Sequence, residues 1–247
     1  MNAEPSSIAQ PTLQPTPEVD LKVVLHLDPN LAHRAELQPL FDKRMTELAA
    51  MGAWGAFAGS HFRPSTSRVT LVTSKHAPDR FTYQFSLVHT APLFTEVIES
   101  LVQHLRVKQP GILDLQVLQT QTRDNKSTPP PYLEPYPFDV EFRASSSDLR
   151  VKVDFDGKCR PEDLADFEYA WKAWQAICAA GGFPTPASEQ SHETSPLTVV
   201  QHPRLERASM SACYSHVDLP DTAFHGLFNQ FSALHDRLAA IDCVVIR

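Results

Sequence analysis

The chain has 247 residues, 42% of them hydrophobic and 21% charged, which is typical of a globular protein with one large domain or two smaller ones. Its formal net charge of −7 argues against a protein whose main task is to hold a nucleic-acid backbone, because such binding depends on clustered cations. Glycine is scarce, with 8 residues against 21 prolines, which disfavours a glycine-rich nucleotide loop, and no apolar run reaches the roughly 20 residues that a membrane-spanning helix needs.

The first 19 residues are polar and contain several prolines (EPSSIAQPTLQPTP), and they predict a disordered N-terminal tail. A secretory signal needs a basic start followed by an apolar stretch. This segment has neither, so we expect a cytoplasmic protein.

Residues 20–122 predict six elements in the order βαββαβ. Alternating apolar residues indicate strands, and apolar residues at helical spacing indicate helices. In chain order these are a strand over Leu21–Leu27, a helix over Glu36–Met51, strands over Arg68–Thr73 and Phe81–His89, a helix over Ala91–Val107 and a strand over Ile112–Leu118. Pro39 is expected near the first turn of its helix, where its missing N–H costs little.

Residues 139–247 predict the same order of elements. They are a strand over Leu149–Phe155, a helix over Pro161–Ala180, strands over Leu197–Gln201 and Ala208–Val217, a helix over Thr222–Leu238 and a strand over Ile241–Ile246. Residues 123–138 form a proline-rich linker between the halves, for which we expect an extended conformation.

The two halves also resemble each other in sequence. Residues 20–28 read DLKVVLHLD and residues 148–156 read DLRVKVDFD, with four of the nine positions identical at an offset of 128. The same offset pairs Pro92 with Pro220, and Leu113-Asp114-Leu115 with Ile241-Asp242-Cys243. We interpret these matches as an internal repeat.

The predicted fold class is α+β, a tandem repeat of two ferredoxin-like (βαββαβ) units. Each unit is expected to form a four-stranded antiparallel sheet with two helices on one face. The expected division is a tail over 1–19, the first repeat over 20–122, the linker over 123–138 and the second repeat over 139–247.

Strand alternation gives each predicted sheet an apolar face under the helices and an open polar face. Leu113, Leu115 and Val117 are expected on the apolar side of the first sheet. The aromatic residues of its third strand fall there too, which argues against an RNA-binding sheet surface. The open faces are either solvated, or in contact with a partner, or turned toward each other around a ligand cavity. The cavity would be lined by Lys22, His26, Gln84, Asp114, Arg150, Lys152, Asp154 and Asp242.

The predicted helix over Pro161–Ala180 is aromatic on more than one side, although a core needs only one apolar stripe. The surplus indicates either ordinary burial or a surface for a protein partner or a second subunit. The candidate partner-binding residues are Phe167, Tyr169, Trp171 and Trp174.

No metal site or cofactor is predicted. The four cysteines, Cys159, Cys178, Cys213 and Cys243, lack the short spacings of zinc ligands. Free buried thiols are the expectation for Cys178 and Cys243.

Two functions follow as hypotheses. The first is a non-catalytic interaction or assembly protein that binds a protein partner or itself through its sheet faces and the aromatic helix. The alternative is a small-molecule-binding enzyme, built like an α+β barrel, with a polar site between the two open faces.

Overall fold

The computed structural model of the chain describes residues 18–30, 34–52, 54, 69–88, 92–109, 111–120, 136–142, 148–157, 160–183, 196–206, 208–215, 217–237 and 241–247. Within these residues, four helices and nine strands make a mixed α+β fold with one sheet of four strands and one of five. None of the described helices is long and apolar enough to cross a membrane. Residues 1–17 of the predicted N-terminal tail and most of the predicted linker lie outside the described residues, and the first strand begins at Glu18, within the predicted tail.

The first sheet belongs to the N-terminal half of the chain. Its elements are β1 (Glu18–Leu27), α1 (Arg34–Met51), β2 (Val69–Ala77), β3 (Arg80–Val88), α2 (Pro92–Lys108) and β4 (Ile112–Thr120). The strand order is β2-β3-β1-β4, and every neighbouring pair is antiparallel. Pro39 lies inside α1 rather than in its first turn, because the helix begins two residues earlier than predicted.

The second sheet belongs to the C-terminal half. Its elements are β5 (Asp139–Phe142), β6 (Leu149–Phe155), α3 (Pro161–Ala179), β7 (Thr198–Glu206), β8 (Ser209–Ser215), α4 (Asp221–Arg237) and β9 (Ile241–Ile246). The strand order is β5-β9-β6-β8-β7. β5 pairs with β9 in parallel, so the prediction of a four-stranded antiparallel sheet is wrong here. Four exposed residues are too few for periodicity to reveal a strand.

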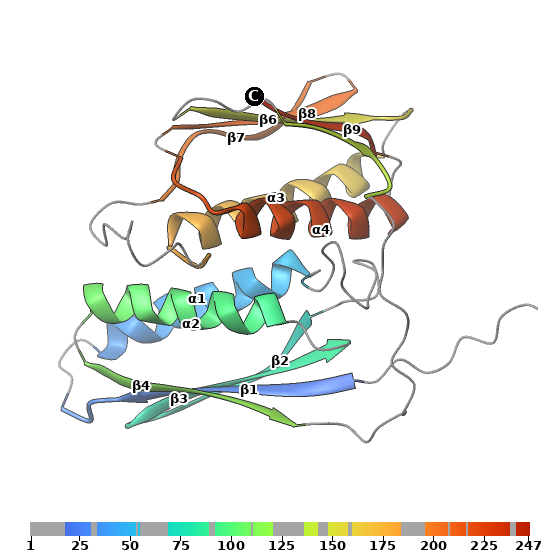
Figure 1. Cartoon of the computed structure of the whole chain (residues 1–247). Coiled ribbons are helices and arrows are strands. Elements are labelled where there is room, and N and C mark those ends of the chain that lie inside the picture. The colour runs from blue at the N-terminus through green and yellow to red at the C-terminus, as the bar shows by residue number, and fades with distance from the viewer. Residues whose placement is uncertain are drawn as a thin grey trace, which may run out of the picture.

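The two sheets lie on the outside of the molecule, and the four helices fill the space between them (Figure 1). The helices of one half therefore pack against those of the other, and each sheet turns its helix-free face away from the centre. The structure thus separates the two polar faces. The residues it describes do not form the shared cavity that was one expectation from the sequence.

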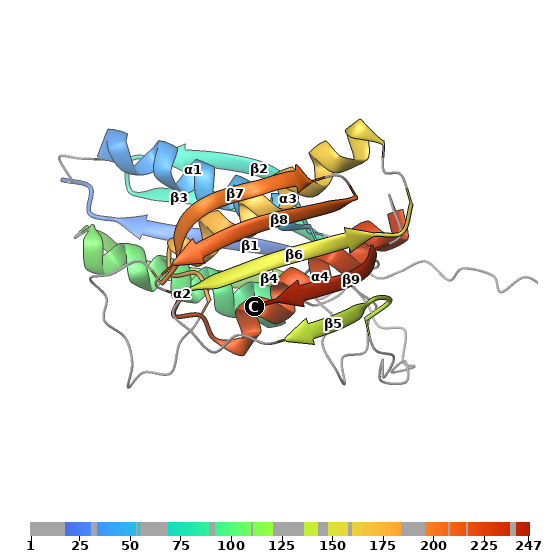
Figure 2. The same cartoon turned by 90° about the horizontal axis from the view of Figure 1, so that it is seen from above.

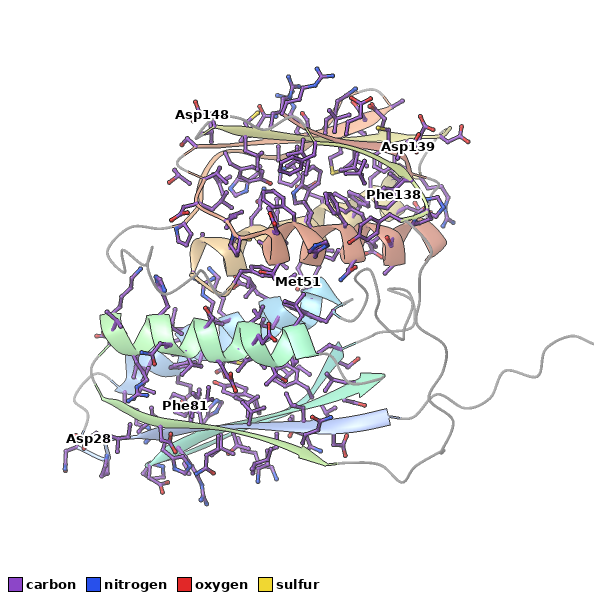
Figure 3. The ribbon with its side chains drawn as sticks, viewed as in Figure 1. Asp28, Met51, Phe81, Phe138, Asp139 and Asp148 are labelled. Atoms are coloured by element: carbon purple, nitrogen blue, oxygen red, sulfur yellow. The ribbon has the colours of Figure 1, made fainter. Side chains whose placement is uncertain are left out.

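Specific contacts join the two helix layers. The Ser100 hydroxyl on α2 donates to the Gly181 carbonyl after α3, at 2.9 Å, and the Arg44 guanidinium on α1 donates to the Ala176 carbonyl on α3, at 3.3 Å. The rings of Trp54 and Phe183 stack with centroids 6.3 Å apart. One cluster of buried apolar residues therefore runs through both halves. Figure 3 shows Phe81 between the first sheet and its helices, and Met51 between the two helix layers.

Both sheets carry an irregularity at matching positions, between His26 and Leu27 in β1 and between Asp154 and Phe155 in β6. In the first sheet Leu27 pairs with Ile112, which is buried, and Leu113 is 55% exposed. The expectation that Leu113 faces the helices is therefore wrong, because the bulge turns it outward.

The register at the bulges also differs from the offset that the sequence comparison predicts. His26 lies opposite Asp114, and Asp154 lies opposite Cys243, so the last strands correspond at an offset of 129 and not 128. Asp242 lies in the bulge, as Leu113 does in the first sheet, and is exposed like it. Cys243 holds the regular position opposite Asp154.

The aromatic residues of α3 are mostly core residues. Phe167, Trp171 and Trp174 are buried, and only Tyr169, at 59% exposure, is free to meet a partner. The Trp171 indole donates to the Tyr214 hydroxyl at 2.9 Å, beneath the second sheet. The expectation of an aromatic partner surface is wrong for the three buried residues, because α3 lies between a sheet and a second helix layer and is covered on two sides.

Candidate functional site

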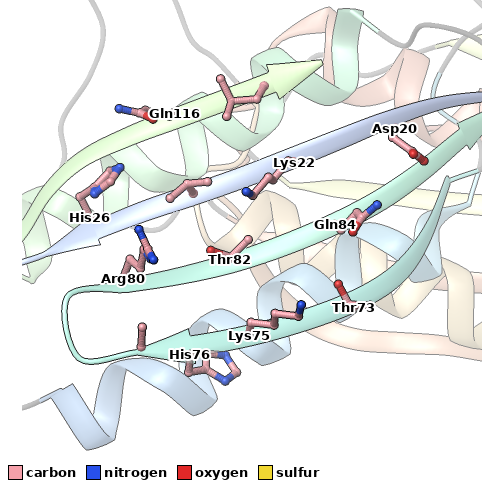
Figure 4. Close-up of a pocket in the computed structure, with 13 residues that line it drawn as sticks. Asp20, Lys22, His26, Thr73, Lys75, His76, Arg80, Thr82, Gln84 and Gln116 are labelled. Carbon is pink, nitrogen blue, oxygen red and sulfur yellow. The ribbon is translucent and has the colours of Figure 1, made fainter. Parts of the chain in front are cut away.

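The outer face of the first sheet contains a polar hollow of about 590 Å³ (Figure 4). All four strands contribute to it. Its lining consists of Asp20, Lys22, Val24, His26, Thr73, Lys75, His76, Ala77, Arg80, Thr82, Gln84, Gln116 and Leu118.

Strand alternation explains why these residues share one face. Lys22 pairs across the sheet with Gln84, and His26 pairs with Arg80, so alternate residues of β1 and β3 point outward together. The residues between them, such as Leu25 and Phe81, are buried under α1 and α2. The hollow is therefore held on rigid strands.

Three exposed cations dominate the charge of the hollow. They are Lys22 on β1, Lys75 on β2 and Arg80 on β3, and Asp20 is the carboxylate among the lining residues. Within the described part of the chain, none of the three cationic side chains takes part in an ion pair or a side-chain hydrogen bond. The first sheet thus presents unneutralised positive charge on a chain whose net charge is negative.

His26 adds an unused hydrogen-bonding atom to this face. Its Nε2 atom is covered, yet it has no hydrogen-bond partner among the residues that the structure describes. Across the strand pair lies the exposed Asp114 of β4, at the border of the hollow.

The outer face of the second sheet differs in charge. The Lys152 ammonium forms an ion pair with the Asp154 carboxylate, with Nζ and Oδ1 2.7 Å apart. Burial first, and then the carboxylates of Glu141 and Asp154, raise the pKa of the Cys243 thiol, which reports the acidic surroundings at this edge. Arg150 lies in a separate hollow of about 440 Å³ with Cys213 and Arg247.

The eight predicted cavity residues therefore divide into two groups. Lys22, His26, Gln84 and Asp114 lie together on the first sheet, the first three of them in its hollow. Arg150, Lys152 and Asp154 lie on the opposite outer side of the molecule, and Asp242 lies in a bulge.

One lining residue of the hollow, His76, belongs to a cluster that was not predicted from the sequence. His76 Nε2 lies 2.9 Å from Asp42 Oδ1, and the Tyr83 hydroxyl donates to the same oxygen at 3.1 Å. Burial, and next the Asp42 charge, raise the pKa of Tyr83 far above its ordinary value, so the phenol stays protonated and keeps donating. Through these contacts Asp42 links α1 to His76 of β2 and Tyr83 of β3. His76 is 34 positions from Asp42 in the chain, and Tyr83 is 41 positions from it. Such distant residues form no local sequence motif from which the cluster could be predicted.

Among the described positions, no group of three or more His, Cys, Asp or Glu side chains is placed to hold a metal ion. Burial raises the pKa of the Cys178 thiol well above its ordinary value, which keeps this thiol in its unreactive protonated form. Comparison with known proteins adds no identification, since no protein-family model and no curated protein matches the chain.

Proposed function

We propose that this is a non-catalytic binding protein, in which the outer face of the first sheet binds an acidic segment of a protein partner. One observation carries the proposal: Lys22, Lys75 and Arg80 share a hollow, and within the described residues no carboxylate is paired with any of them. Exposed cations gathered on one face attract a negatively charged partner and orient it before contact.

The surroundings of the cations suit a peptide or protein segment. Thr73, Thr82, Gln84 and Gln116 add hydroxyl and amide groups that can bond to backbone or carboxylate atoms. Because these residues and the three cations together extend over all four strands, several acidic side chains could be engaged at once. The second sheet supports no equivalent proposal, since Lys152 is paired and carboxylates surround Cys243.

The alternative, an enzyme acting on a small acid, would use the same hollow without the second sheet. It is distinguished by its ligand: a single compact acid such as citrate would then bind more tightly than an acidic peptide.

Reversing two charges tests the proposal. The variant Lys22→Glu/Lys75→Glu should bind a fluorescent peptide of eight glutamates at least about tenfold more weakly than the unchanged protein, as measured by fluorescence anisotropy at low salt. The affinity of the unchanged protein should itself fall as salt is raised, because exposed charges are screened.

A matched control variant changes the net charge by the same amount at two lysines outside the hollow. Lys43 on α1 and Lys108 on α2 are exposed and lie on the helix side of the first sheet, so Lys43→Glu/Lys108→Glu should weaken binding much less. Equal weakening in both double variants would refute a site on the sheet face. Tight binding of citrate, with no binding of the peptide, would favour the enzyme instead.

We further infer that the two halves are copies of one ferredoxin-like unit. The shared order βαββαβ, the matching central strand orders and the bulges at His26–Leu27 and Asp154–Phe155 support this interpretation. A cytoplasmic location stays a prediction from the sequence.

A further inference from the structure

The two sheets differ at one corresponding edge. β4 and β9 hold the same place in their sheets, each antiparallel to the first strand of its unit. β9 is covered by β5, which lies beside it in parallel (Figure 2). Among the residues that the structure describes, no strand lies on the outer side of β4.

Backbone hydrogen bonds show which groups face the free edge. Leu27 N–H donates toward β3, to the Asp79 carbonyl, and Asp28 N–H donates to the Gly111 carbonyl on the β4 side. Because successive residues of a strand direct their backbone groups to opposite sides, His26 and Val24 bond to their partners on β4. The residues between those partners, Leu115 and Val117, therefore direct their N–H and C=O groups outward.

Two other outer strands, β2 and β7, have features that discourage pairing with a further strand, and β4 has few such features. β2 has a bulge between Leu71 and Thr73 and an exposed lysine, Lys75. β7 has two irregularities and contains a proline, Pro203. Residues 115–119 of β4 read LQVLQ, which contains no charge, no proline and no bulge. An edge of this kind is competent to accept another strand.

β5 shows what such a strand looks like. Its sequence is DVEF, and Val140 and Phe142 align with Val244 and Ile246, which are buried on the helix side of the sheet. The Phe142 ring meets Phe224 of α4 edge to face, with centroids 5.5 Å apart. In the first sheet, Leu115 and Val117 hold the positions of Val244 and Ile246, and they are only partly buried. Apolar side chains of an added strand would cover them, as Val140 and Phe142 cover the edge of the second sheet.

We propose that the free edge of β4 binds an extended peptide segment of a partner protein as a fifth, parallel strand, with apolar side chains at alternate positions facing α2. Main-chain hydrogen bonds would supply the affinity and the alternating apolar residues the specificity. The inference rests on the edge and on β5, so it stands or falls independently of the cationic hollow.

The probe is a synthetic peptide with the sequence of residues 138–143 (FDVEFR), which contains the strand that covers the equivalent edge. It should protect the Leu115 and Val117 amides of the full chain from hydrogen exchange. Val117→Pro removes one outward N–H without removing a bond to β1, so peptide binding should weaken at least about tenfold. Val117→Ala loses the same side chain and keeps the N–H, and should weaken binding by less than about threefold.

Orientation supplies an independent readout. A nitroxide at the peptide N-terminus should broaden amide signals near Ile112 more than those near Gln119, as parallel addition requires. Equal loss of binding in Val117→Pro and Val117→Ala, or protection confined to β9, would overturn the proposal. So would a concentration-dependent dimer abolished by Val117→Pro in the absence of peptide, because a second copy would then be the occupant.

Discussion

Replacing Trp174 by alanine should lower the free energy of unfolding by about 3–5 kcal/mol. The indole is fully buried, its N–H donates to the Ala223 carbonyl at 2.8 Å, and its ring meets Tyr214 edge to face. The change would leave a large cavity between α3 and α4 and remove a partner from a buried carbonyl. Denaturant unfolding followed by circular dichroism measures the loss.

Tyr169 provides the matched control on the same helix. Because it is 59% exposed, Tyr169→Ala should change the free energy of unfolding by less than about 0.5 kcal/mol. If Trp174→Ala and Tyr169→Ala lower the free energy of unfolding equally, the side of α3 that carries Trp174 is not buried as the structure shows. The aromatic residues would then be available as a partner surface after all.

Replacing Gly181 by alanine should destabilise the protein by about 2–4 kcal/mol. Gly181 has φ +77°, a left-handed conformation that side chains with a Cβ adopt only with strain, and an added Cβ would come within 2.5 Å of His104 Nδ1 on α2. The contact crosses from one half of the chain to the other. The cost therefore measures how closely the two helix layers approach.

A substitution at Gly157 separates the cost of backbone strain from the cost of the steric clash with His104. It has φ +96°, and an added Cβ would meet nothing within 4 Å, so Gly157→Ala should cost only the backbone strain, about 1–2 kcal/mol. In a double-mutant cycle, His104→Ala should recover part of the loss in Gly181→Ala, because it removes the clashing ring. Strict additivity of the two changes would show that the halves do not touch there.

Periodicity was a good guide to the single elements. The strands Leu149–Phe155 and Ile241–Ile246 have the predicted bounds, and the helix at Pro161 begins at its proline, as the missing N–H of that residue favours. These segments are long enough, and apolar enough on one side, for local pattern to decide their structure. β5 is neither.

The arrangement of the halves could not be predicted in the same way. Which face of a helix meets a second helix layer depends on residues far apart in the chain, such as Gly181 and His104. A signal was nevertheless present, since Phe167, Trp171 and Trp174 surround more of α3 than a sheet alone can cover. A helix apolar on more than one side is expected when it is buried on both.

Part of the candidate site could be predicted from the alternation of side chains along the strands. Alternation along one strand assigns Lys22 and His26 to the open face, and pairing with β3 adds Gln84, so the first sheet's group was within reach. Lys75 and Arg80 could not be assigned to this face, because both lie outside the predicted strands and inside the observed β2 and β3. Alternation could not place Asp242, because it is the extra residue of the bulge opposite Asp154 and Phe155.

The four helices lie between two outward-facing sheets, and this arrangement leaves the cationic face of the first sheet open to a partner. Nitroxide labels at Lys22→Cys and Lys152→Cys, in a background with the native cysteines replaced by alanine, report the separation of the two outer faces by double electron–electron resonance. Three layer spacings of about 10 Å each give an expected distance of about 30 Å or more. A distance below about 20 Å would mean that the two polar faces meet, and would contradict the account.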